Sequence, residues 1–99
     1  MSDDHLWRVE LTSPAVRDLG RIPPRYAAAI VEFLTAVLPT NPPRLGKPMR
    51  NELEGLHSAR RGDYRVLYRI DHDQHAAFVL RIDHRGSVYK SRWPSRRSK

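Results

Sequence analysis

Residues 60–71 read Arg-Arg-Gly-Asp-Tyr-Arg-Val-Leu-Tyr-Arg-Ile-Asp, and this stretch decides the fold. Side chains alternate between two faces from residue 64 to residue 70, and this period of two predicts a β-strand with one buried face. The apolar face carries Tyr64, Val66, Tyr68 and Ile70. Arg61-Gly62-Asp63 suits a tight turn, so we expect a short strand over Leu56–Arg60 to pair with the longer one.

A third strand is predicted on the carboxyl side of this pair. Asp71–His75 is a polar connection of hairpin length, and Ala76–Ile82 follows it. In that segment Phe78, Leu80 and Ile82 are expected to share one face. Ser87–Tyr89 could add a last short strand. The strands over residues 56–82 should therefore form an antiparallel meander.

The first forty residues predict one strand and two helices. Leu6–Leu11 alternates, with Trp7, Val9 and Leu11 on one face. Ser13-Pro14 is a typical helix start, Val16 and Leu19 should share a helix face, and Gly20 is a plausible end. Pro23-Pro24 opens a second helix with two adjacent apolar stripes, and Pro39 ends it. The helix stripes contain Tyr26, Ile30, Phe33 and Val37, and Ala27, Val31, Leu34 and Leu38.

The expected fold class is therefore α+β, with the order β-α-α-β-β-β and a helical hairpin packed on a small antiparallel sheet. Pro42-Pro43 should keep the chain extended, and Arg44–Gly55 should be irregular. We expect one domain over residues 1–89. Residues 90–99 are basic and poor in apolar groups, which predicts a flexible tail.

The charge and the lack of cysteine limit the classes of function that this chain can have. The chain of 99 residues has 18 Lys and Arg against 11 Asp and Glu, a net charge of +7, and no cysteine. Thiolate chemistry and cysteine zinc sites are excluded, and the charge favours a polyanionic partner such as nucleic acid. No apolar run could span a bilayer, and the acidic start at Met1–Asp4 does not resemble a signal peptide. We expect a cytoplasmic protein without metal, cofactor or membrane contact.

Three segments resemble the RelE/ParE toxin superfamily. They are Gly46-Lys47-Pro48 with Leu53-x-Gly55, then residues 60–68, and finally Ile82-Asp83-His84-Arg85-Gly86-Ser87-Val88-Tyr89. The order of elements also matches, so the resemblance covers the chain to about residue 89. It implies a fold like that of the small microbial RNases. RelE-type members cleave mRNA in the ribosomal A site, whereas ParE-type members share the fold and poison DNA gyrase, so the family does not fix the function.

RNA cleavage by attack of the 2′-OH needs a base, cations that stabilise the phosphate, and an acid for the leaving 5′ oxygen. The resemblance assigns phosphate stabilisation to Arg65 and places His84, Arg85 and Tyr89 at the active site. His84 could be the general acid, because histidine titrates near neutrality, and Arg85 a phosphate contact; a shift of one residue between the two is open. Lys47, Arg60, Arg61 and Arg81 are candidate RNA contacts. Each could equally be a plain surface charge, and Tyr89 could be a core residue.

The general base is the weakest part of this prediction. The best-known RelE-type enzymes carry a lysine pair just before the Tyr-Arg strand, and this chain has Leu56 and Ser58 near those positions. YoeB-like relatives use a glutamate shortly after a Gly-Lys-Pro segment, so Glu52 is the candidate base here. Turn solvation is the alternative for Glu52.

Three functions remain open: a ribosome-dependent mRNA endonuclease that inhibits translation, a ParE-like gyrase inhibitor without nuclease activity, and an inert or DNA-binding accessory. The resemblance implies a cognate antitoxin as partner, with ribosome and mRNA as the target, and promoter DNA as a further partner of the toxin–antitoxin complex. The nuclease hypothesis requires Arg65 and an imidazole to converge on one side of the sheet.

Overall fold

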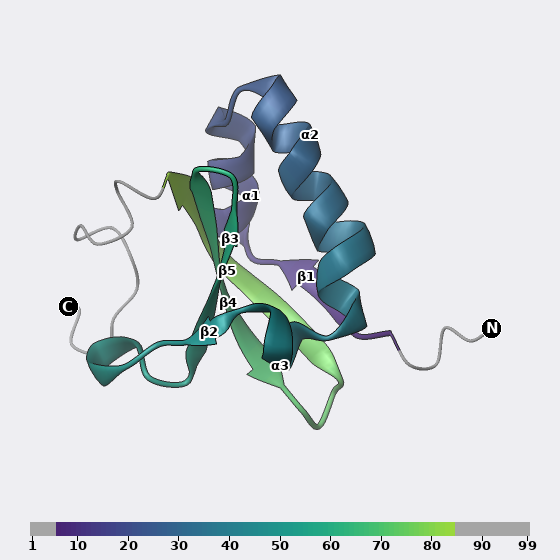
Figure 1. The fold of residues 1–99 in the computed structure, drawn as a ribbon, viewed down its shortest axis with the longest axis vertical. Helices are drawn as coiled ribbons and strands as arrows, with labels where there is room; N and C mark the ends of the chain where they lie inside the picture. The colour runs from purple at the N-terminus through teal and green to yellow at the C-terminus, as the bar shows by residue number, and fades with distance from the viewer. Residues whose placement is uncertain (1–5, 85–99) are drawn as a thin grey trace.

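The computed structural model describes residues 6–84, and these form one mixed sheet with helices packed on it (Figure 1). The strands are β1 (Arg8–Leu11), β2 (Lys47–Pro48), β3 (Leu56–Arg61), β4 (Tyr64–Asp71) and β5 (Ala76–His84), in the sheet order β1-β5-β4-β3-β2. The α+β class and the antiparallel β3-β4-β5 meander are confirmed. The sheet is mixed because β1 pairs with β5 in parallel.

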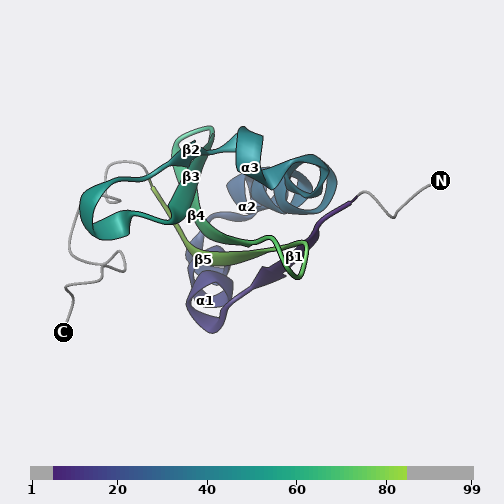
Figure 2. The ribbon, with the colours of Figure 1, turned by 90° about the horizontal axis from the view of Figure 1, so that it is seen from below.

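The helices are α1 (Ser13–Arg21), α2 (Pro24–Glu32) and the short α3 (Pro42–Leu45). A π-helical turn, η2 (Phe33–Val37), and a 3-10 turn, η3 (Leu38–Thr40), extend α2. Figure 2 shows α2 inside the curve of the sheet and α1 on the far side of β5. Within residues 6–84 no helix is long and apolar enough to cross a membrane.

The main core lies between the sheet and α2. Tyr64, Val66, Tyr68 and Ile70 of β4 all face it, so the predicted strand and its apolar face are confirmed. Ile30, Phe33, Leu34 and Leu38 supply the helical side from α2 and the turns that extend it, and Ala15 of α1 belongs to the same core. A second, smaller cluster on the other face of the sheet joins Leu67 to Met49, Leu56 and Leu80. We call this second face, which points away from α2, the outer face.

A β-bulge changes the predicted face of β5. Leu67 pairs with Arg81 and Tyr68 pairs with Val79, so Leu80 is an extra residue on β5. Ala77, Val79 and Ile82 face the main core, whereas Leu80 packs with Leu67 on the outer face. Phe78 and Leu80 therefore lie together on the outer face, and the prediction that all three residues share a face was wrong for Ile82.

Three local predictions in the first half were also wrong. α1 continues through Gly20 to Arg21, and its buried positions are Ala15 and Asp18, while Val16 is 54% exposed. Pro42-Pro43 begins α3 and does not keep the chain extended, because proline at the first helical positions costs no hydrogen bond. Arg44–Gly55 is not wholly irregular, since β2 pairs with β3 and a 3-10 turn, η4 (Asn51–Leu53), follows. The possible strand at Ser87–Tyr89 lies outside the described residues.

Gly46 marks a close approach between α3 and the sheet. The buried Tyr68 hydroxyl donates a hydrogen bond of 2.6 Å to the Pro42 carbonyl. A Cβ at position 46 would overlap that hydroxyl and come within about 3.0 Å of the Ser58 carbonyl oxygen. Burial raises the pKa of Tyr68 to about 12, against the opposing effect of a hydrogen bond from the Gly46 backbone. This contact fixes β2, and with it Lys47, at the edge of the sheet.

Candidate active site

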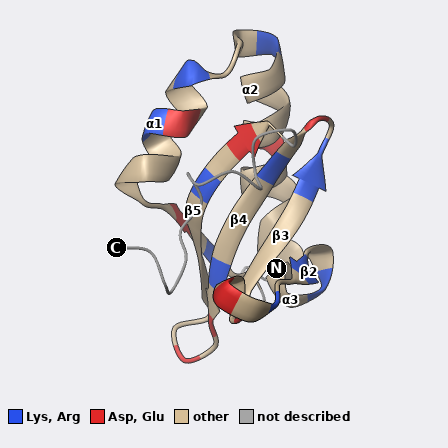
Figure 3. Ribbon diagram, turned by 90° about the vertical axis from the view of Figure 1, so that its left-hand side faces the viewer, with Lys and Arg blue, Asp and Glu red and all other residues tan. Residues whose placement is uncertain are grey.

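Basic residues lie along the strands of the meander, which face the viewer in Figure 3, and the strand register assigns each of them to a face of the sheet. Arg65 of β4 lies directly opposite Arg60 of β3 on one side and Asp83 of β5 on the other. Lys47 of β2 pairs with Ser58, the outer-face neighbour two residues before Arg60. Opposite residues in an antiparallel pair share a face, so Lys47, Arg60 and Arg65 lie on the same side of the sheet. The structure thus brings together three of the predicted site residues.

The Arg60–Arg65 pair is unfavourable for folding. Like charges directly opposite each other across two strands destabilise a sheet, since their Cβ atoms lie only about 4.5–5.5 Å apart. Arg65 is half-buried, so water screens its charge less than it would at the surface. Asp83 lies directly opposite Arg65 on the other side, and its charge also acts on Arg81. The pair is suited to an anionic ligand, because arginine binds phosphate through a planar fork of donors.

His84 lies at the same end of the sheet as Arg65 but on the other face. It pairs with Tyr64, and the two rings make an edge contact at 5.5 Å between centroids. Tyr64 faces the main core and lies 6.0 Å from the Tyr26 ring of α2. The convergence of Arg65 with this imidazole on one face is therefore not found.

Arg60 and Arg61 lie on opposite faces of the sheet. Arg61 pairs with Tyr64 on the core side, and its guanidinium lies 5.3 Å from the centre of the Phe33 ring. Arg60 stays exposed on the outer face, where Nε donates a long hydrogen bond of 3.4 Å to the Gly62 carbonyl. Of these two candidate RNA contacts, Arg60 alone lies on the face of Arg65.

Glu52, the candidate base, lies in η4, just before β3 begins at Leu56. Arg60, which is opposite Arg65, is four residues further along β3. A strand rises about 3.3 Å per residue, so these two ends of β3 are separated by roughly 13 Å. Glu52 and Arg65 thus belong to opposite ends of the strand pair. The described residues also contain no group of three or more side chains that could hold a metal.

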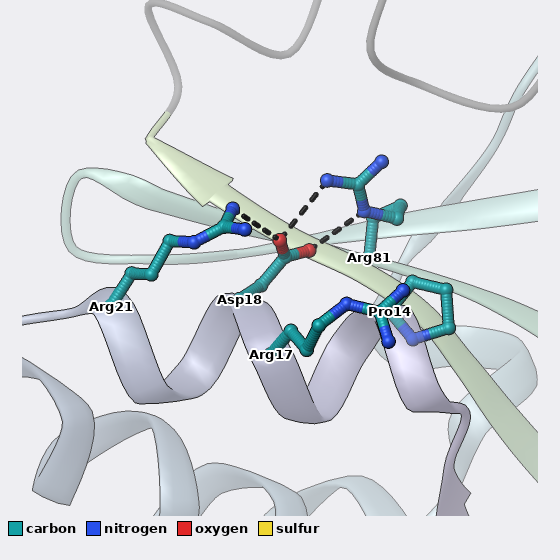
Figure 4. A pocket seen from close by; sticks show the side chains of 5 residues that line it. All are labelled: Pro14, Arg17, Asp18, Arg21 and Arg81. Atoms are coloured by element: carbon teal, nitrogen blue, oxygen red, sulfur yellow. Dashed lines mark hydrogen bonds and ion pairs between the residues drawn. The ribbon is translucent and has the colours of Figure 1, made fainter.

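Arg81, the fourth candidate RNA contact, is tied to Asp18 of α1 (Figure 4). Its Nε and Nη2 donate to the two carboxylate oxygens at 2.7 and 3.0 Å, and the Ile82 backbone N–H donates at 2.9 Å. Burial alone would raise the pKa of Asp18, but the hydrogen bonds from Arg81 and Ile82, with the charges of Arg81 and Arg21, lower it. The pKa of Arg81 is raised, first by its hydrogen bond to Asp18. Arg81 therefore has a structural task that the sequence did not reveal.

Sequence reasoning missed two acids. Asp83 lies on the outer face opposite Arg65; its Oδ1 accepts the His84 N–H at 2.8 Å, and its Oδ2 is buried. Its only signal is the β-bulge, because counting back from the turn places Ile82 opposite Arg65, and the extra residue Leu80 shifts the register so that Asp83 stands there. Asp18 gave no such signal, since a charged residue on a nine-residue helix is usually exposed. Arg85 and Tyr89 lie outside the described residues, and their roles stay predictions.

Comparisons with known proteins agree on one family. The model described as "ParE toxin of type II toxin-antitoxin system, parDE" matches residues 9–89. Toxin RelE of Mycobacterium tuberculosis is 56% identical over 90 residues, covering 91% of this chain and 93% of the relative. Toxin RelG of the same organism is 50% identical over 84 residues, covering 85% and 97%. The toxin–antitoxin complex RelBE2 from that organism matches with a TM-score of 0.79 and 49% identity, covering 85% of this chain and 97% of the solved chain.

Proposed function

Because this chain belongs to the ParE toxin family and is a RelE-type toxin of a type II toxin–antitoxin system, we propose that it is a metal-independent endoribonuclease that cleaves mRNA on the ribosome. The observation that carries this proposal is the cross-strand pair of Arg60 and Arg65 on the outer face. The pair places two positive charges at one point of the outer face, and phosphoryl transfer needs positive charge where negative charge develops.

In the proposed reaction the 2′ oxygen attacks the adjacent phosphorus as it loses its proton to a base. The bond from phosphorus to the 5′ oxygen breaks, leaving a 2′,3′-cyclic phosphate, and the departing oxygen takes a proton. Arg65 and Arg60 stabilise the extra charge on the phosphate. Because His84 contacts Tyr64 on the other face, we assign the proton donor to Arg85 or Tyr89 in preference to His84.

A poorly placed base is tolerable if the ribosome orients the RNA. General acid–base catalysis contributes about 10²–10⁴-fold, whereas orientation reaches effective molarities of about 10⁵–10⁸ M. Glu52, at the other end of β3, is too remote in the described structure to act on a linkage held by Arg65. We therefore expect little cleavage of naked RNA, and we place the activity in the cytoplasm with the ribosome.

The test induces the chain in bacteria and maps mRNA 5′ ends, alongside purified protein with and without programmed ribosomes. New in-frame cuts that need the ribosome and disappear with Arg65→Ala support the proposal. The matched control is Arg69→Ala, on the outer face of the same strand, where the guanidinium lies over the Phe78 ring at 4.7 Å. Equal cleavage of naked and ribosome-bound mRNA, or full activity of Arg65→Ala, contradicts it.

A ParE-like gyrase inhibitor is the second candidate, and the name of the matching family model favours it. The same induction experiment separates the two, because gyrase inhibition would leave mRNA intact and accumulate stalled gyrase complexes. The RelBE2 structure is a toxin–antitoxin complex, and by this similarity we propose that a cognate antitoxin binds the chain. Binding of promoter DNA by that complex is a further proposal.

A further inference from the structure

A shallow hollow opens between α1 and the half of β5 that follows the bulge (Figure 4). Its lining consists of Pro14, Arg17, Asp18, Arg21 and Arg81. Three guanidinium groups thus surround one carboxylate, a formal excess of two positive charges. Both oxygens of that carboxylate already accept hydrogen bonds from Arg81, and one also accepts from Ile82. The hollow therefore remains positive after its internal pairing is complete.

Arg17 and Arg21 carry this excess charge. They are four residues apart on α1, so they lie on one helix face, and both are exposed. Arg21 approaches Asp18 loosely, with 3.8 Å between Nη1 and Oδ1 and with 63% of its side chain exposed. Within residues 6–84, Arg17 makes no side-chain hydrogen bond or ion pair. Two guanidinium forks are thus available to a ligand at the hollow.

The hollow adjoins the candidate active site. Arg81 and Asp83 are two residues apart on β5, which is about 6.6 Å along the strand, and Asp83 lies opposite Arg65. An RNA strand with a phosphate on Arg60 and Arg65 can therefore place a neighbouring phosphate in the hollow. We propose that the hollow is a second phosphate-binding subsite, which holds the RNA backbone beside the linkage that is cut. This inference rests on the proposed nuclease function and adds a position for the substrate strand.

An acidic side chain of a protein partner could meet the same arginines. RNA fits better because its phosphates repeat along the strand, so that one ligand reaches both the hollow and the outer face. Arginine also matches phosphate through two parallel hydrogen bonds. Asp18 has a separate role, since it holds Arg81 in place and closes the floor of the hollow.

The test measures binding of a labelled single-stranded 2′-O-methyl oligoribonucleotide, which lacks the attacking hydroxyl and so reports binding independently of cleavage. Full-length protein is compared with Arg17→Gln/Arg21→Gln and with Arg8→Gln/Arg44→Gln. The second pair removes the same charge from β1 and α3, away from the hollow. Arg17→Gln alone is a further variant, because it removes no contact from the folded chain. Thermal unfolding checks that each variant is folded.

Each lost phosphate contact on a single strand lowers the slope of log K against log salt by about 0.7. Because the hollow holds one phosphate, we expect the hollow pair to lower the slope by about 0.7 and to weaken binding about tenfold, with a smaller slope change for Arg17→Gln. The control pair should change binding less than about threefold. If both double variants lose the same RNA affinity, the effect comes from net charge alone and the proposal is wrong. Unchanged RNA binding would also overturn it, and weaker antitoxin binding in that case would identify protein carboxylates as the ligand.

If the wild-type chain binds the oligoribonucleotide as expected but never cuts mRNA, the proposed nuclease function fails and the subsite stands as an RNA-binding site. If cleavage on ribosomes depends on Arg65 while the hollow pair binds and cuts like the wild type, the subsite fails alone. The two proposals are therefore refuted by different results.

Discussion

Replacing Asp18 with asparagine removes the charge that holds α1 on β5. β1 pairs with β5 only as far as Val79, and beyond that point α1 takes its place. The Thr12 hydroxyl donates to the Val79 carbonyl at 2.9 Å, and Asp18 accepts the Ile82 N–H at 2.9 Å. Asp18 is 6% exposed, and it also binds Arg81 through two hydrogen bonds. Asparagine keeps the size but removes the carboxylate that pairs with the Arg81 guanidinium, although the charge of Asp83 still acts on it.

Removing one partner of a buried ion pair costs about 3–5 kcal/mol. Arg81 retains some access to water, with 17% of its side chain exposed, so we expect the lower end, about 3 kcal/mol. The total stability of a domain is about 5–15 kcal/mol, and each kcal/mol shifts Tm by about 4–8 °C at this size. Asp18→Asn should therefore unfold roughly 12–24 °C earlier than the wild type.

The pH dependence supplies a second readout. The pKa of Asp18 is lower in the folded chain than its usual 3.8, so its stabilisation is complete above about that value. It is lost as the pH falls further, through the folded pKa. The wild type should lose this part of its stability in acid, and Asp18→Asn should not. The assay is thermal or urea unfolding followed by circular dichroism, with the exposed turn residue Asp73→Asn as control. Equal midpoints for Asp18→Asn and Asp73→Asn would refute the reasoning.

Three further predictions concern other contacts. Gly46→Ala should destabilise the chain by about 1–3 kcal/mol through overpacking against the Tyr68 hydroxyl. The double variant with Tyr68→Phe should recover part of this loss. A urea midpoint of Gly46→Ala equal to that of the wild type would contradict the prediction. Burial is the main cause that lowers the pKa of His57 below 6.5, and the charge of His72 adds to it. The wild type should therefore lose stability as the pH falls below about 6.5, and His57→Gln should lose less. Urea midpoints that vary with pH in the same way in both proteins would contradict this prediction. Asp83→Asn should lower ribosome-dependent cleavage about two- to fivefold, because Asp83 lies directly opposite Arg65 and cross-strand pairs of opposite charge are worth roughly 0.2–1 kcal/mol; unchanged cleavage, with an unchanged Tm, would exclude a positioning role.

The strand pattern of the second half could be predicted because its period of two is unbroken on β4. Tyr64, Val66 and Tyr68 lie on the core side as expected, and the predicted turns lie at Gly62 and before Ala76. The alternation also assigns Arg65 to the outer face. Each of these inferences uses only neighbours along the chain, which is the information that a sequence pattern contains.

The parts that could not be predicted depend on pairing between distant segments. The parallel pairing of β1 with β5 has no local signature, and the bulge at Leu80 is visible only when Tyr68 is aligned with Val79. Asp18 looked like a solvated helix residue, because its partners, Arg81 and the Ile82 N–H, are more than sixty positions away. His84 was placed by motif, and the register with Tyr64 then assigned it to the other face.

The bulge divides β5 into two halves with different neighbours. Before it, Ala77 and Val79 face the core beside β1; after it, Ile82 faces the core beside α1. The extra residue gives two consecutive positions, Leu80 and Arg81, that do not point into the main core. Leu80 seals the small outer cluster, and Arg81 reaches Asp18. A strand of strict alternation could not satisfy both, since one of the two would have to enter the main core. Leu80, the extra residue of the bulge, made the predicted faces of β5 wrong. The same residue lets β5 contribute both to the candidate active site and to the arginine-lined hollow beside it.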